Sequence, residues 1–169
     1  MSQSYNAALL NKIITDFQKG ERKPSFDKLK EFLKDNPKHD MARYNFAFMC
    51  EQMNNLDLAI KNYIQINNNN SKHWRSRFNL YLIYIKQKKY KQALIIVNEV
   101  LGIKNNYQPA LRDKALILYY LNKPDESIKF IVDSINQNPL DYIAINTLGL
   151  CYLAMKQYDE AKKIFKKGI

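Results

Sequence analysis

Apolar residues recur along this chain with the spacing of helices rather than of strands. In several segments a small residue is followed four positions later by a large apolar one, which places both on one face of a helix. These pairs are Ala59 with Tyr63, Ala93 with Val97, Ser127 with Ile131, and Ala161 with Phe165. Only four glycines and five prolines interrupt the 169 residues. The pattern predicts an all-α fold and disfavours an all-β or Rossmann-like architecture.

The same pattern returns every 34 residues, which makes the chain an internal repeat. The small residues of one helix mark it, as do a second series in the preceding helix and a third at an earlier small position. The second and third series are Phe46, Leu80, Lys114 and Leu148, and Ala8, Ala42, Ser76, Ala110 and Ala144. Five units of two helices each are expected, at about residues 4–37, 40–73, 74–107, 108–141 and 142–169. The expected helices are 4–18, 25–35, 40–53, 56–68, 74–87, 90–102, 108–121, 124–136, 142–155 and 158–168.

The last unit carries the fullest set of marker residues: Leu148, Gly149, Tyr152, Tyr158, Ala161 and Phe165. In order and spacing they resemble the tetratricopeptide repeat (TPR) family, and Pro37 and Pro139 stand where that family usually has a proline. The resemblance covers nearly the whole chain. It implies one repeat domain, 1–169, wound as a right-handed α-solenoid of about five helix-turn-helix units. Three departures from the family pattern predict looser packing in the fourth unit: Lys114, Pro124 and Ser127.

The resemblance also places the first helix of each pair on the concave side of the superhelix. Residues just outside the buried stripe of these helices form the predicted partner-binding surface: Tyr44, Phe48, Arg75, Phe78, Leu82, Arg112, Leu116, Tyr119, Asn146 and Leu150. The same face continues through Leu10, Ile14, Phe17, Met41 and Leu153. Such an apolar groove suits an amphipathic helix or extended hydrophobic peptide, with Arg75 and Arg112 orienting an acidic group on it. For each side chain the alternative is packing on the adjacent helix.

Some TPR proteins hold the acidic C-terminal tail of a chaperone with lysine, asparagine and arginine on three successive first helices. Asn79 suits one asparagine position, but Tyr44 and Phe48 stand where lysine and asparagine are needed. Pro109 and Asp113 occupy two positions of the next unit that require cations. We therefore predict that this chain does not bind tails of that type.

A formal charge of +11 raises the alternative of an RNA-binding helical repeat. The excess is mostly lysine in a chain also rich in isoleucine and asparagine, a composition that AT-rich coding produces in any protein. Positions that would read bases are largely apolar, and no series of aromatics with arginine is present. These features argue against nucleic acid and favour a protein or peptide partner.

The sequence lacks phosphate-binding glycine-rich loops, Gly-x-Ser-x-Gly, His-Glu-x-x-His and paired-cysteine metal spacings. His39 and His73 lie 34 apart at the junctions between units, where a loop role explains them better than a metal site does. We predict no catalytic residues, no metal and no cofactor, and hence a scaffold rather than an enzyme.

No signal peptide or membrane span is expected, and Cys50 and Cys151 are expected to be buried thiols, which suits a cytoplasmic protein. The last helix lacks the polar cap that terminal repeats usually have. Two alternatives follow from that: the chain is the non-catalytic arm of a larger enzyme, such as a glycosyl- or sulfotransferase, or its last helix mediates self-association.

Overall fold

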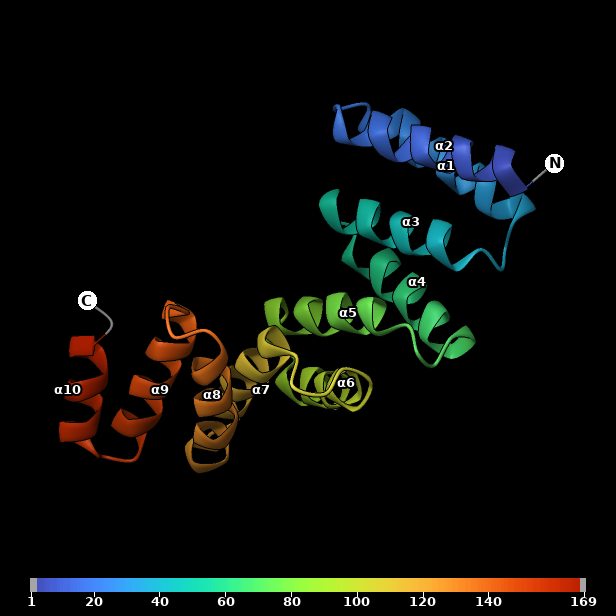
Figure 1. Ribbon diagram of the computed structural model, residues 1–169. Helices are drawn as coiled ribbons and strands as arrows, with labels where there is room; N and C mark the ends of the chain where they lie inside the picture. The colour runs from blue at the N-terminus through green and yellow to red at the C-terminus, as the bar shows by residue number, and fades with distance from the viewer. Residues whose placement is uncertain (1–2, 168–169) are drawn as a thin grey trace. The chain divides into compact units, whose positions relative to one another are not determined.

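The computed structural model describes residues 3–167, and in this range it contains ten α-helices and no strands (Figure 1). The helices are α1 (Gln3–Gln18), α2 (Arg22–Asp35), α3 (Asp40–Gln52), α4 (Leu56–Asn69), α5 (Trp74–Lys86), α6 (Tyr90–Ile103), α7 (Gln108–Tyr120), α8 (Pro124–Gln137), α9 (Tyr142–Ala154) and α10 (Tyr158–Lys167). Each expected helix is confirmed, with ends within one residue except at α2. That helix begins three residues early, because Pro24 falls in its first turn, where no amide hydrogen is needed.

The chain forms two compact units, residues 1–76 and 77–169, and α5 crosses the boundary between them. Unit 1 holds α1 to α4, and unit 2 holds α6 to α10 with most of α5. The prediction of an all-α helical repeat is confirmed. The expectation of one continuous, right-handed superhelical domain stays a prediction.

In unit 1, α1 packs on α2, α2 on α3, and α3 on α4. The small residues that carry the repeat, Ala42 and Ala59, are fully buried, as the close approach of two helices requires. Tyr63 fills the space beside them with no exposed surface. Phe26 of α2 stacks on Phe46 of α3 with ring centroids 4.8 Å apart, which joins the first pair to the second.

In unit 2, the fourth pair packs tightly despite its departures from the family pattern. Ser127 is fully buried on α8 and donates a hydrogen bond to the carbonyl of Ala115 on α7 at 2.7 Å. Lys114 places its ammonium 3.7 Å from the ring centroid of Phe130, a cation–π contact. A hydrogen bond and a cation–π contact thus replace apolar contacts, and the expectation of looser packing is wrong.

The turn within each helix pair contains one residue in the left-handed region, and these residues are themselves 34 apart. They are Gly20, Asn54, Lys88, Asn122 and Lys156, with φ of 105°, 60°, 57°, 59° and 60°. Glycine adopts this conformation without steric cost, and asparagine tolerates it better than lysine does. The series fixes the geometry of the turn, and the apolar pattern gives no sign of it.

A second series caps the first helix of each pair. His39 accepts a hydrogen bond at Nδ1 from the amide of Ala42 at 3.2 Å, and His73 accepts one from the amide of Ser76 at 3.3 Å. Asp141 stands at the same repeat position and accepts from the amides of Ile143 and Ala144. Both histidines therefore lie at the junctions, as predicted, and act there as caps.

No helix in the range 3–167 combines the length and the apolar character needed to cross a membrane.

Candidate protein-interaction surface

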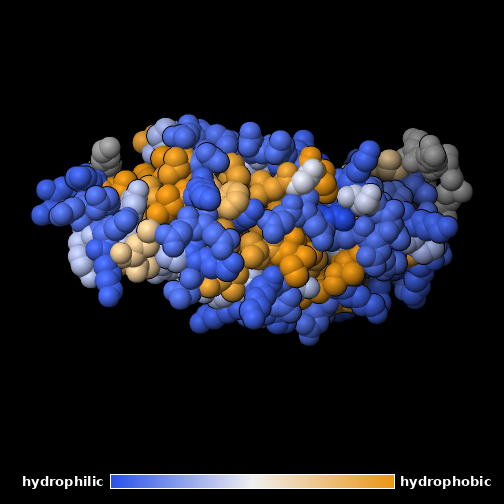
Figure 2. Space-filling model, turned by 90° about the horizontal axis from the view of Figure 1, so that it is seen from below, coloured by the Kyte–Doolittle hydropathy of each residue, from blue (hydrophilic) through white to orange (hydrophobic). Residues whose placement is uncertain are grey.

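The predicted surface of unit 2 lies on the first helices α5, α7 and α9. Leu116 and Tyr119 of α7 and Leu150 of α9 are half-buried. Each stands one position outside a buried stripe, since its neighbours Ala115, Ile117 and Cys151 or Gly149 and Leu118 are buried. Helices α7 and α9 pack on each other, so the three side chains belong to adjoining helices. Figure 2 shows one face of the molecule, on which hydrophobic side chains reach the surface between hydrophilic ones.

On α5, Phe78 and Leu82 are half-buried and pack against the core of unit 2. The ring of Phe78 lies 5.1 Å from that of Tyr81 and 5.7 Å from that of Tyr107. Part of each side chain therefore serves the core, as the alternative interpretation allowed. The remaining surface is free to contribute to binding.

At the end of α7, aromatic rings extend this surface. Tyr119 lies 5.5 Å from Tyr120, which is 51% exposed and stacks on Tyr90 of α6 at 4.7 Å and 13°. Sequence reasoning missed Tyr90 and Tyr120, because their contact joins the second helix of one pair to the first helix of the next. Asn146 of α9 is exposed.

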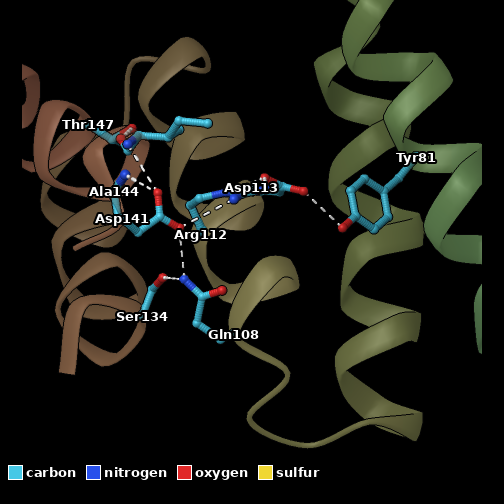
Figure 3. Close-up of polar contacts among 9 residues, drawn as sticks. Tyr81, Gln108, Arg112, Asp113, Ser134, Asp141, Ala144 and Thr147 are labelled. Atoms are coloured by element: carbon cyan, nitrogen blue, oxygen red, sulfur yellow. Dashed lines mark hydrogen bonds and ion pairs between the residues drawn. The ribbon is translucent and has the colours of Figure 1, made fainter. Parts of the chain in front are cut away.

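Arg112 lies in a polar network that links three elements of unit 2 (Figure 3). Its Nε donates to Oδ1 of Asp113 at 2.9 Å, and its Nη1 donates to Oδ2 of Asp141 at 3.3 Å. Gln108 donates to the same Asp141 oxygen at 2.9 Å, and Tyr81 donates from α5 to Oδ2 of Asp113 at 3.0 Å. The arginine that was expected to face a ligand thus already contacts two carboxylates.

The electrostatics of this network follow from burial and pairing. Burial raises the pKa of Asp113, and the hydrogen bonds from Arg112 and Tyr81 offset it only in part. Burial alone would raise the pKa of Asp141, but hydrogen bonds from Gln108 and the Ala144 amide, together with Arg112, lower it. Burial and the neighbouring Asp113 carboxylate raise the pKa of Tyr81, which therefore stays a neutral donor.

In unit 1 the predicted residues divide into an exposed and a buried group. Phe48 of α3 is 41% exposed, and Tyr44 is half-buried with its ring 5.5 Å from His73. Arg75 is exposed and lies over the ring of Trp74 at 4.9 Å. Met41 is also exposed, at 58%.

The placement of Leu10 and Phe17 on this surface is wrong. Both are buried, at 5% and 8% exposure. Together with Ile13 they form a stripe at positions i, i+3 and i+7, the face of α1 that turns toward the helices it packs on, α2 and α3. Ile14, beside that stripe, is half-buried.

A pocket between α1 and α2 lies outside the predicted surface. It has a volume of 460 Å³, with Leu9, Ile13 and Phe32 among its apolar lining and Glu31 and Asp35 among its acidic residues. Among the described residues no group of three or more histidine, cysteine or carboxylate side chains is placed to hold a metal ion.

The sequence profile of the family described as Psidin, N-terminal TPR repeats region, matches residues 75–169, more than half of the chain. The chain belongs to this TPR family. The resemblance inferred from the 34-residue pattern is thereby confirmed. No curated protein matches the TPR chain in sequence.

Solved structures share the fold of this TPR chain. A double mutant of MamA RS-1 matches with a TM-score of 0.89 at 15% identity, covering 96% of this chain and 92% of that one. MamA from Desulfovibrio magneticus RS-1, residues 41 to the end, matches at 0.88 and 16%, covering 96% and 93%. A TPR protein from Parabacteroides merdae matches at 0.86 and 18%, covering 95% of this chain and 64% of that one. At these identities the likeness establishes the fold.

Proposed function

We propose that this TPR chain is a non-catalytic scaffold that binds a helix or peptide of a partner protein through its first helices. Repeats of this kind use the surface of stacked helices for binding. In unit 2 the proposed surface comprises Phe78, Leu82, Arg112, Leu116, Tyr119, Asn146 and Leu150, and in unit 1 it comprises Tyr44, Phe48 and Arg75.

The observation that carries the proposal is the half-exposure of Leu116, Tyr119 and Leu150 on two helices that pack together. Apolar side chains at these positions gain little for the fold while part of their surface remains in water. A partner that covers them removes that surface from water. Arg112 lies beside them with its charge balanced by Asp113 and Asp141, so the surface favours apolar rather than acidic ligand groups.

The test replaces Leu116 and Leu150 by serine and compares the proteins captured by the full chain and by the variant. Ile95→Ser is the matched control, because Ile95 is 61% exposed on α6, outside the proposed surface. Native partners should be lost with the double variant and kept with the control, while circular dichroism shows equal helicity for both. Capture that survives the double substitution would show that the surface is elsewhere.

A further inference from the structure

Two buried arginines occupy the same repeat position but have different partners. Arg43 of α3 and Arg77 of α5 are 34 residues apart and are 9% and 7% exposed. The Nε of Arg77 donates to Oε2 of Glu99 on α6 at 2.7 Å. The residue 34 positions before Glu99 is Gln65, on α4. The repeat therefore supplies a carboxylate to one arginine and omits it at the other.

Arg43 makes hydrogen bonds only to neutral oxygens. Its Nη1 donates to Oδ1 of Asn62 at 3.1 Å, and its Nη2 donates to the carbonyl of Pro37 at 2.5 Å. Within the described part of the chain its buried Nε has no hydrogen-bond partner, and no carboxylate lies within ion-pair distance. Burial lowers the pKa of Arg43, and the charge of Asp40 opposes this. A buried guanidinium without a counterion is costly, so a carboxylate at Nε would stabilise it.

A pocket of 390 Å³ between α2, α3 and α4 contains this arginine in its lining. Three exposed lysines also line it, Lys30, Lys34 and Lys61, and none of its lining residues is acidic. Lys34 pairs with Glu31 at 2.7 Å, whereas Lys30 and Lys61 have no ion-pair partner among residues 3–167. The pocket therefore concentrates positive charge around the unpaired Nε.

The same pocket has apolar walls, formed by Leu33, Phe46 and Leu58. A free inorganic anion gains nothing from such walls, whereas a peptide with an apolar side chain next to its acidic one does. The repeat itself shows which group this arginine position accepts, because Glu99 offers a carboxylate to the Nε of Arg77.

We propose that this pocket binds a carboxylate from an acidic and apolar segment of a partner protein, which takes at Arg43 the place that Glu99 has at Arg77. Because Nε is covered in this structure, the ligand reaches it through a small rearrangement of side chains in the pocket wall. The site lies on α2, α3 and α4 of unit 1. It is independent of the surface proposed in unit 2, so either proposal can fail without the other.

The experiment measures fluorescence anisotropy of a labelled peptide of alternating glutamate and leucine titrated with the full chain. Saturable binding is expected, and Gln65→Glu should weaken it about tenfold or more, because the new carboxylate occupies the site from within. The same substitution should raise the melting temperature. Lys30→Gln with Lys61→Gln should also weaken binding, whereas Lys129→Gln with Lys162→Gln removes the same charge elsewhere and should leave it unchanged.

Three outcomes would overturn the proposal. One is equal binding of a peptide with glutamine in place of glutamate, and another is equal loss of affinity in the two lysine double variants, which would indicate nonspecific attraction to a basic chain. The third is displacement of the peptide by inorganic phosphate at concentrations where acetate has no effect, which would point to a phosphate site. In the unaltered protein, the Nε–H resonance of Arg43 should shift as the peptide binds.

Discussion

The hydroxyl of Tyr81 on α5 donates a hydrogen bond to Oδ2 of Asp113 on α7, 3.0 Å away, and both residues are buried. A buried carboxylate without its donors is destabilising, so this hydrogen bond ties successive first helices together inside unit 2. Asp113 was considered in the sequence only as a charge that would repel an acidic ligand. In the structure its oxygens are occupied by Tyr81 and Arg112, so it serves the fold.

Tyr81→Phe should therefore destabilise the protein by about 1–3 kcal/mol, since it leaves one oxygen of a buried carboxylate without its donor. Tyr84→Phe is the control: Tyr84 packs on the same core, and among the described residues its hydroxyl has no hydrogen-bond partner. Urea unfolding followed by circular dichroism gives both values. Equal losses for the two variants would mean that the Tyr81 hydrogen bond contributes nothing.

Asp141→Asn should lower stability at neutral pH and lose this effect in acid. The asparagine keeps an acceptor for the amides that cap α9 but loses the charge that pairs with Arg112, a loss of about 1–2 kcal/mol. The folded pKa of Asp141 lies below its ordinary value, so its contribution is present above the unfolded pKa of about 3.9 and disappears as pH falls through the folded pKa.

The free energy of unfolding of the two proteins, measured from pH 7 down to pH 2, checks this. The difference should be greatest above about pH 5 and should vanish in acid. Asp113 contributes with the opposite sign, because its pKa is raised and its ionised form is the costly one. It is present in both proteins and cancels in the comparison, so a difference that grows in acid would contradict the assignment.

The apolar pattern predicted the helices well because each pair buries a stripe with helical spacing, and Ala59, Ala93 and Ala161 are buried as that spacing requires. It did not predict the network around Arg112, because hydrogen bonds between helices depend on side-chain directions that hydrophobicity does not encode. The error at Leu10 and Phe17 has a related cause. The concave face was taken from the later units, whereas α1 turns those two residues toward the helices beneath it.

The contrast between Arg43 and Arg77 was accessible from the sequence in principle. Their positions, and those of Gln65 and Glu99, differ by the same 34 residues that define the repeat. Only the structure shows that the first helix and second helix of a pair bring such residues together across the pair.

RNA binding offers a test of whether the charge of +11 has a function of its own. The half-exposed positions on α7 and α9 are mostly apolar, and the stacked Tyr90 and Tyr120 use a face of each ring on the other. We expect no binding of mixed-sequence single-stranded RNA in a filter-binding assay at physiological salt. Retained binding with a steep salt dependence would instead assign the lysines to phosphate contacts.

Lys88→Gly should stabilise the protein, although glycine usually destabilises. Lys88 has φ of 57° in the turn between α5 and α6, where a side chain costs about 1–2 kcal/mol and glycine costs nothing. Glycine also gains entropy in the unfolded chain, which returns part of that benefit, so the net gain should be about 0.5–1 kcal/mol. Lys129→Gly removes the same charge from the exposed face of α8 and should cost about 1 kcal/mol. Opposite signs for the two substitutions in thermal unfolding would establish that the backbone, and not the loss of a lysine, determines the effect; a loss of stability at both positions would show that the left-handed turn carries no strain.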